Sequence, residues 1–143
     1  MVRDLRKPLV IFTPKSLLRN KDATSPLTEF TKGSFQTVIP EQDDAIEKKA
    51  AKVKRVIACS GKVYYDLVRR REEKKSFDTA VIRVEQLYPF PGEPLVKRLS
   101  RMTNVEEVVW AQEEPRNNGY WFFVEPFVEE ALAQAEIETI SAW

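Results

Sequence analysis

Few residues in this chain could do chemistry, because it contains no histidine and only one cysteine. Histidine is the commonest general base near neutral pH and the commonest zinc ligand, so its absence weakens any hydrolase-triad or metal-site interpretation. Carboxylates, lysines and the thiol of Cys59 remain. Glu113 and Glu114 form a carboxylate pair after an apolar stretch, but acid–base catalysis also needs a partner group and a pocket.

A first candidate anion site lies where Thr13-Pro14 is expected to begin a helix. Thr13 is an acceptable N-cap, and proline suits a first helical turn. Lys15, Ser16 and Arg19 would then stand at a helix N-terminus, where an anion is favoured. The simpler interpretation, which the base rate for charged residues favours, is that Lys15 and Arg19 form the solvated face of a short helix.

A second candidate anion site is the turn at Ser60-Gly61. Residues 53–59 form an apolar run, and Val63, Tyr64 and Leu67 then recur at helical spacing, which predicts a strand, a tight turn and a helix. Such a turn can hold a phosphate through the Ser60 hydroxyl and the amides that follow it. A single glycine is a weak signal, since nucleotide-binding fingerprints need several, and a plain strand-to-helix turn is the more frequent explanation.

The elements that would position these groups alternate along the chain. Residues 81–87 predict a strand that stops at Pro89 and Pro91, and residues 92–102 predict a helix with Pro94 in its first turn. Further strands are expected at residues 8–12, at residues 34–40 as an edge strand, and in the apolar run before Glu113. This pattern predicts an α/β fold with a mostly parallel sheet of about five strands, covered on both faces.

The segments between these elements carry weaker signals. Residues 41–52 are rich in charge and are expected to be a mobile insertion. Residues 113–120 predict a wide turn in which Gly119 or an asparagine takes a positive φ. The last helix is expected to break near Pro126. It begins with so many aromatic residues that part of this surface, around Tyr120, Trp121, Phe122 and Phe127, is expected to meet another domain or subunit.

Length and composition favour one domain, residues 1–143, with 43% hydrophobic residues to form a core. The 23 basic and 22 acidic residues leave a net charge of +1, which provides no general attraction for nucleic acid or an anionic membrane. No signal peptide or membrane span is apparent, and the lone Cys59 suits a reducing compartment such as the bacterial cytoplasm or the mitochondrial matrix.

Four blocks carry a resemblance to a known family: PLVIFTPKSLLRN, VKRVIACSGKVYYDLVRRRE, VIRVEQLYPFP and VVWAQEEPRNNGYW. In this order and with these gaps they closely resemble the carboxy-terminal domain of the thiamine-diphosphate-dependent dehydrogenase component of 2-oxoglutarate dehydrogenase complexes. The resemblance covers about residues 7–128. It implies a transketolase carboxy-terminal-like fold, a three-layer αβα sandwich with one antiparallel strand in a mixed sheet.

The resemblance also implies what this chain would contribute. In that family, thiamine diphosphate, magnesium and the substrate-binding histidines belong to preceding domains, so the chain alone is expected to hold no cofactor and to be inactive. Its role would be structural and regulatory, within an enzyme that decarboxylates 2-oxoglutarate in the tricarboxylic acid cycle and passes the acyl group to a lipoyl carrier. The implied partners are the other domains of the parent dehydrogenase, its dimer mate and the lipoyl acyltransferase.

Two departures from the family pattern stand out. Relatives continue past the last helix into a strand with an Arg-Tyr-x-Gly-Arg-Pro pattern, which is absent here, so the final strand is expected to be missing. In actinobacterial relatives this domain helps to bind acetyl-CoA as an activator, through residues that match Ser34, Thr37 and Gln86 and through a basic pair. That basic pair falls on Glu93 and Pro94 here, so we expect weak or absent binding of acetyl-CoA or a nucleotide effector.

Two alternatives stay open on the sequence alone. The first is the same domain of a 2-oxoadipate dehydrogenase, because the two substrates would be distinguished by the missing domains. The second is a free-standing α/β module that binds a small anion at Ser60 or at the helix start near Lys15.

Overall fold

The computed structural model describes residues 7–8, 10–137 and 140–142. The chain divides into two compact units, residues 1–33 and 34–143. The smaller unit contains a 3-10 helix, η1 (Lys15–Arg19), and a short helix, α1 (Leu27–Lys32), neither of which has a buried residue. The expected strand at residues 8–12 is wrong for the residues that the structure describes there: Val10, Ile11 and Phe12 form no strand and are exposed.

The larger unit is built on a five-stranded sheet in the order β1-β3-β2-β4-β5. The strands are β1 (Val38–Ile39), β2 (Arg55–Cys59), β3 (Thr79–Val84), β4 (Glu107–Ala111) and β5 (Ile140–Ala142). β1 pairs antiparallel with β3, and the other pairs are parallel. The predicted mixed sheet with one antiparallel strand is confirmed, although β3 ends at Val84, earlier than expected.

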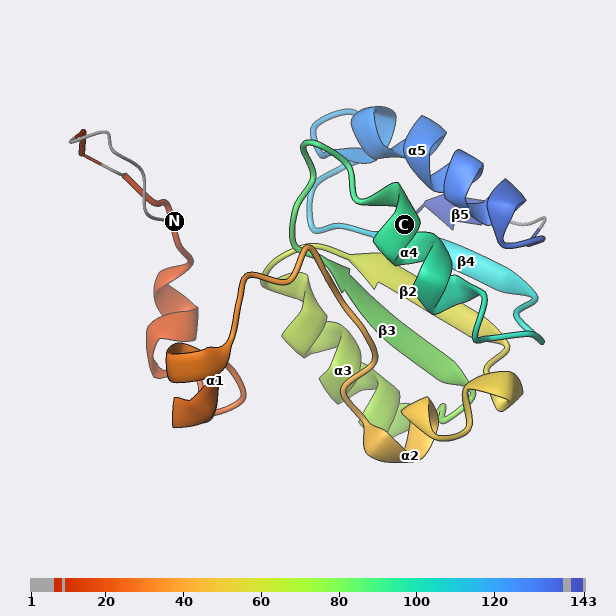
Figure 1. The fold of residues 1–143 in the computed structure, drawn as a ribbon, viewed down its shortest axis with the longest axis horizontal. Helices are drawn as coiled ribbons and strands as arrows, with labels where there is room; N and C mark the ends of the chain where they lie inside the picture. The colour runs from red at the N-terminus through yellow and green to blue at the C-terminus, as the bar shows by residue number, and fades with distance from the viewer. Residues whose placement is uncertain (1–6, 9, 138–139, 143) are drawn as a thin grey trace. The chain divides into compact units, whose positions relative to one another are not determined.

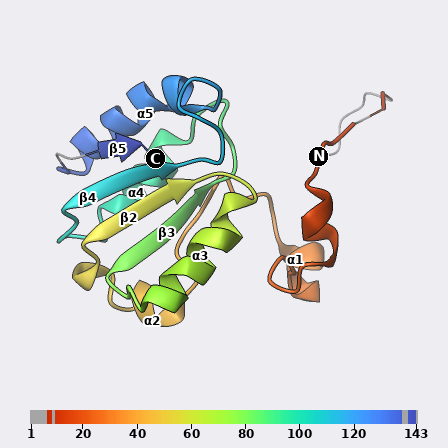
Figure 2. The same cartoon turned by 180° about the vertical axis from the view of Figure 1, so that it is seen from behind.

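Helices cover both faces of this sheet, as the sandwich prediction requires (Figures 1 and 2). On one face lies α3 (Val63–Lys74), which follows β2. On the other face lie α4 (Gly92–Leu99) and α5 (Trp121–Gln134). Two short helices, α2 (Asp44–Glu47) and η2 (Ala50–Lys52), lie between β1 and β2.

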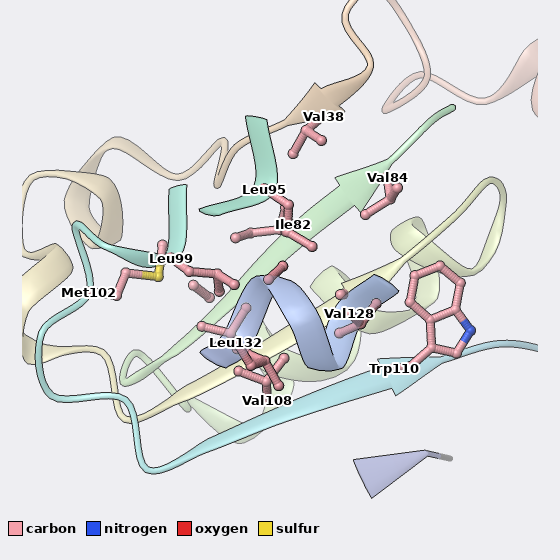
Figure 3. Close-up of a cluster of buried hydrophobic side chains, with 14 of the residues drawn as sticks. Val38, Ile82, Val84, Leu95, Leu99, Met102, Val108, Trp110, Val128 and Leu132 are labelled. Carbon is pink, nitrogen blue, oxygen red and sulfur yellow. The ribbon is translucent and has the colours of Figure 1, made fainter. Parts of the chain in front are cut away.

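The main core lies between the sheet and the α4–α5 layer. Figure 3 shows Leu95 and Leu99 of α4 and Val128 and Leu132 of α5 among side chains from β3 and β4, including Ile82. Alternate residues of β3 point to opposite faces, so Val81 joins the smaller cluster beneath α3 instead. The remaining core members shown are Val38, Val84, Met102, Val108 and Trp110.

Three local expectations were wrong. α5 runs through Pro126 without a break, because one missing N–H removes one helical hydrogen bond while Val124 and Val128, on either side, stay buried in the core. Residues 41–52 are not a loose insertion, since Ile46 and Ala50 are buried. The helix start expected at Thr13 is shifted, because Pro14 occupies the N-cap position of η1.

The chain also forms a strand where none was expected. β5 follows α5 and pairs in parallel with β4, Val108 opposite Ile140 and Val109 opposite Ser141. Strand pairing is made by backbone groups, so it does not require the Arg-Tyr-x-Gly-Arg-Pro sequence. The expectation that the final strand is missing is therefore corrected for residues 140–142, whereas Trp143 lies outside the described residues.

Candidate functional site

The carboxyl ends of β2 and β4 are the place where this topology favours a ligand. These strands are neighbours, and the helices that follow them, α3 and α5, lie on opposite faces of the sheet. Open α/β sheets bind ligands in the crevice at such a switch point. The predicted Ser60-Gly61 turn lies at this point, and Gly61 has φ +72°, a conformation that favours glycine.

An ion pair spans this switch point. Lys62 Nζ donates to Glu113 Oε1 at 2.5 Å, which joins the loop after β2 to the loop after β4. The hydrogen bond to Glu113, and then its charge, raise the pKa of Lys62. An anion at the Ser60 turn would therefore have to compete with Glu113 for Lys62.

The single thiol lies just behind this turn and is poorly suited to react. Cys59 is fully buried between the sheet and α3, in a cluster with Tyr64, Val81 and Ala111. Burial, followed by the charge of Glu85, raises the pKa of Cys59 to about 12. The thiolate is the nucleophilic form, so this cysteine is unreactive at neutral pH.

Gln112 organises the loop after β4, a role that the sequence analysis missed. Its Oε1 accepts hydrogen bonds from Trp110 Nε1 and from the Trp121 backbone N–H, both at 3.1 Å. Its Nε2 donates to the carbonyls of Glu114 at 3.1 Å and Pro115 at 3.2 Å. One amide side chain thus connects β4, the loop and the first residue of α5.

This arrangement also explains Gly119. The residue does not have the predicted positive φ, which among the described residues occurs at Gly61, Lys75 and Glu136. A Cβ at position 119 would instead overlap the side-chain amide of Gln112. Glycine at this position leaves room for the Gln112 side-chain amide, and the backbone conformation does not call for it.

A buried carboxylate, also missed, ties β1 to the rest of the unit. The Glu41 side chain is 0% exposed, and its Oε2 accepts from Arg71 Nη1 at 2.5 Å and from the Val81 N–H at 2.7 Å. Its Oε1 accepts from the Asp43 N–H at 2.8 Å. β1 pairs with β3 only through Val38 and Ile39, so the Glu41 side chain supplies the acceptor that a longer strand would have offered Val81. Nothing local in the sequence distinguishes Glu41 from the charged residues that follow it.

Two of the three expected effector residues lie together at the β1–β3 edge. The Thr37 carbonyl accepts from the backbone N–H groups of Glu85 at 2.9 Å and Gln86 at 3.2 Å. The Gln86 side-chain Nε2 donates to the Pro89 carbonyl at 2.8 Å, which stabilises the proline corner. Ser34 is exposed three residues before Thr37.

A cavity of about 350 Å³ lies next to this edge, between β1 and α4. It is lined by Val38, Glu93, Pro94, Lys97 and Arg98. The two positions of the expected basic pair, Glu93 and Pro94, therefore do line a cavity, with a carboxylate where a cation would serve a phosphate. Lys97 and Arg98 bring two cations to the same wall from the next turn of the helix.

The residues of the first anion candidate lie in the smaller unit. Lys15 and Ser16 are exposed at the start of η1, and Arg19 ends it. A five-residue 3-10 helix has a weak dipole, and Pro14 provides no side-chain cap.

Within the described ranges, no group of three or more histidine, cysteine, aspartate or glutamate residues could hold a metal ion. The same part of the chain includes no helix with the length and apolar character needed to span a bilayer.

Together these features define a class of protein: an α/β domain in which the one thiol is buried and Lys62 is paired with Glu113, with a cavity at one sheet edge. Comparison with known proteins identifies the family. Residues 24–142 match the family described as "2-oxoglutarate dehydrogenase C-terminal", and the chain belongs to it.

Curated relatives agree with this assignment. The chain is 57% identical over 136 residues to a 2-oxoglutarate dehydrogenase E1 component of Cupriavidus necator, covering 95% of this chain and 14% of that protein. It is 52% identical over 122 residues to the protein of the same name from Azotobacter vinelandii, covering 85% of this chain and 13% of the relative. It is 48% identical over 143 residues to the Brucella anthropi protein, covering 95% of this chain and 14% of that relative. The chain thus spans about one seventh of the curated relatives that it matches.

Proposed function

We propose that this chain is the non-catalytic structural and regulatory carboxy-terminal domain of a 2-oxoglutarate dehydrogenase. In this proposal the whole of residues 1–143 belongs to one domain of a larger enzyme, which decarboxylates 2-oxoglutarate and passes the acyl group to a lipoyl carrier. The family match over residues 24–142 carries the proposal. A second support is that the reactive groups at the switch point are already engaged, with Cys59 buried and Lys62 paired to Glu113.

The cofactors of the parent enzyme would lie on its other domains. Thiamine diphosphate supplies the carbon nucleophile for decarboxylation, and magnesium anchors its diphosphate. The described residues of this chain do not fit such a site, because they provide neither a metal-binding cluster nor a histidine.

The domain would act through contacts. Its partners are the remaining domains of the parent dehydrogenase, the dimer mate and the lipoyl acyltransferase. The reported relatives are bacterial, which favours the bacterial cytoplasm over the mitochondrial matrix as its location.

Regulation would involve the edge formed by β1 and the proline corner. Ser34, Thr37 and Gln86 are the proposed polar contacts of an acetyl-CoA-like or nucleotide effector, next to the cavity that Glu93 and Arg98 help to line. Charge-assisted bonds to phosphate are the stronger part of such binding. The resemblance to actinobacterial relatives implies a cation at the position of Glu93, so we propose that this enzyme binds acetyl-CoA weakly or not at all.

Release of CO2 from 2-oxoglutarate tests the proposal. The isolated chain with thiamine diphosphate and magnesium should release no CO2 above a no-protein control. The parent enzyme should release CO2. A parent that lacks residues 34–142 should release none and should no longer dimerise. Activity in the isolated chain, or an unaffected deletion variant, would contradict the proposal, and a preference for 2-oxoadipate would favour the related dehydrogenase.

A further inference from the structure

Four aromatic rings, two from the β3–α4 connection and two from the first half of α5, contact one another in a row. The Tyr88 and Phe123 ring centroids lie 6.4 Å apart, and those of Phe123 and Phe127 lie 5.5 Å apart. Phe90 stacks on Phe127 at 5.3 Å with an interplanar angle of 15°. We call these four residues the aromatic platform.

The platform remains open to solvent. Tyr88 is 82% exposed, and Phe123 and Phe127 are each 39% exposed. Trp121, which the sequence analysis placed on this surface, is instead buried at 3% exposure in the core. Contiguous exposed aromatic surface on a folded domain commonly marks an interaction site.

One carboxylate lies beside the platform without a matching cation in the part of the chain that the structure describes. α5 contains Glu125, Glu129 and Glu130 and no lysine or arginine. Arg116 pairs with Glu125 at 3.4 Å, whereas Glu129 and Glu130 make no ion pair within the described residues. Glu130 follows Phe127 by three residues, which places it on the same side of the helix as the platform rings.

The ring faces and the Glu130 carboxylate, which accepts a hydrogen bond from Gln134 at 3.5 Å but makes no ion pair among the described residues, select the same chemistry. The face of an aromatic ring attracts lysine and arginine, and a carboxylate at the rim attracts them again. A second copy of this surface would bring like charges together, which disfavours self-pairing. The complementary surface therefore carries cationic side chains among apolar ones.

We infer that the aromatic platform binds a lysine- or arginine-bearing segment of the parent dehydrogenase that lies outside residues 1–143. This inference rests on the proposed function. The parent is chosen as the source because the chain spans only 14% of the relative from Cupriavidus necator, so most of the enzyme lies outside it. Glu130 would pair with the cation, and Tyr88 and Phe123 would cover the apolar side chains.

Site-specific photo-cross-linking in the full parent enzyme tests this contact. p-Benzoylphenylalanine is placed at Tyr88 and, as a matched control, at Phe77, an exposed aromatic residue in the turn between α3 and β3 that is 59% exposed. After irradiation, mass spectrometry should identify a peptide from outside residues 1–143, containing lysine or arginine, joined to position 88. The same peptide should be at least about fivefold less abundant at position 77.

Charge variants test the electrostatic part. Glu130→Lys should reduce the yield of the position-88 cross-link about fivefold or more, which is the factor that a rim ion pair of about 1 kcal/mol represents. Glu130→Gln should reduce it less. Glu72→Lys, an equivalent change at an exposed residue of α3, should leave it unchanged.

The inference would be overturned if position 88 formed no cross-link outside residues 1–143. It would also be overturned if position 88 were joined to position 88 of a second copy or to the acyltransferase, or if positions 88 and 77 gave equal yields. CO2 release and dimerisation, measured on the same variants, separate this inference from the proposed function. If the position-88 cross-link is absent but the parent enzyme still needs residues 34–142 for activity and dimerisation, the platform contact alone is rejected.

Discussion

Replacing Glu41 should lower the free energy of unfolding of the larger unit. Its carboxylate accepts three hydrogen bonds, from Arg71, Val81 and Asp43, at 2.5, 2.7 and 2.8 Å. Glu41→Gln keeps the shape but removes the charge, and one of the three donors then faces an NH2 group. The Arg71 side chain, 4% exposed, would be left with Asp43 as its nearest carboxylate, at 3.9 Å.

Breaking a buried ion pair by removing one partner typically costs about 3–5 kcal/mol, because the other charge stays buried without compensation. We expect this loss for Glu41→Gln and a similar loss for Arg71→Met. The double variant Glu41→Leu with Arg71→Met removes both charges and leaves chiefly the Val81 N–H without its acceptor, a cost of about 1–3 kcal/mol. The double variant should therefore be more stable than either single variant.

Urea unfolding measures these free energies, with fluorescence of the buried Trp110 and Trp121 as the signal. Lys54→Gln provides the control, because the side chains of its ion pair with Glu106 are 59% and 68% exposed, so the pair should contribute little to stability. A Glu41→Gln variant that loses less than 1 kcal/mol, or a double variant whose loss equals the sum of the single losses, would refute the reasoning.

Three further predictions concern other parts of the larger unit. Cys59 should resist alkylation in the native protein and react once the protein is unfolded. Because burial raises the pKa of Cys59 from 9.0 to about 12, its contribution to stability is full below pH 9 and falls as the pH rises toward 12. The Cys59→Ala variant should not show this loss when unfolding is measured as a function of pH. Gly119→Ala should destabilise the loop after β4 by about 1–3 kcal/mol in urea, since its Cβ displaces the Gln112 amide, and combining it with Gln112→Ala should cost less than the sum. Calorimetric titration of the parent should detect no tight acetyl-CoA binding, and any residual affinity should fall about tenfold in a Lys97→Ala, Arg98→Ala variant; low-micromolar affinity insensitive to these changes would contradict the cavity assignment.

The elements with strong local periodicity could be predicted from the sequence. The apolar run before Ser60 and the helical spacing of Val63, Tyr64 and Leu67 correspond to β2 and α3. The proline corner and the first turn around Pro94 likewise correspond to the connection after β3 and the start of α4. The alternation of strand and helix was enough to predict the sheet class, because each element buries one face against its neighbour.

The candidate site was less accessible to sequence reasoning. Thr37 and Gln86 were placed by resemblance, and the structure brings their backbones together across 49 positions of chain. Gln112 carried no motif, and its four hydrogen bonds arise only when β4, its loop and α5 are assembled. A polar side chain that acts through such contacts has no periodicity to detect.

What the sequence by itself determined was the strongly periodic local elements, the absence of histidine chemistry and, through the resemblance, the family. Only the tertiary structure decided which charged residues are structural. Glu41 lies in a run of solvated charges, yet it meets Arg71 and the Val81 N–H 30 and 40 positions away because β1 pairs over only two residues. Burial removes those groups from water, so the hydrogen bonds between them become necessary to the fold.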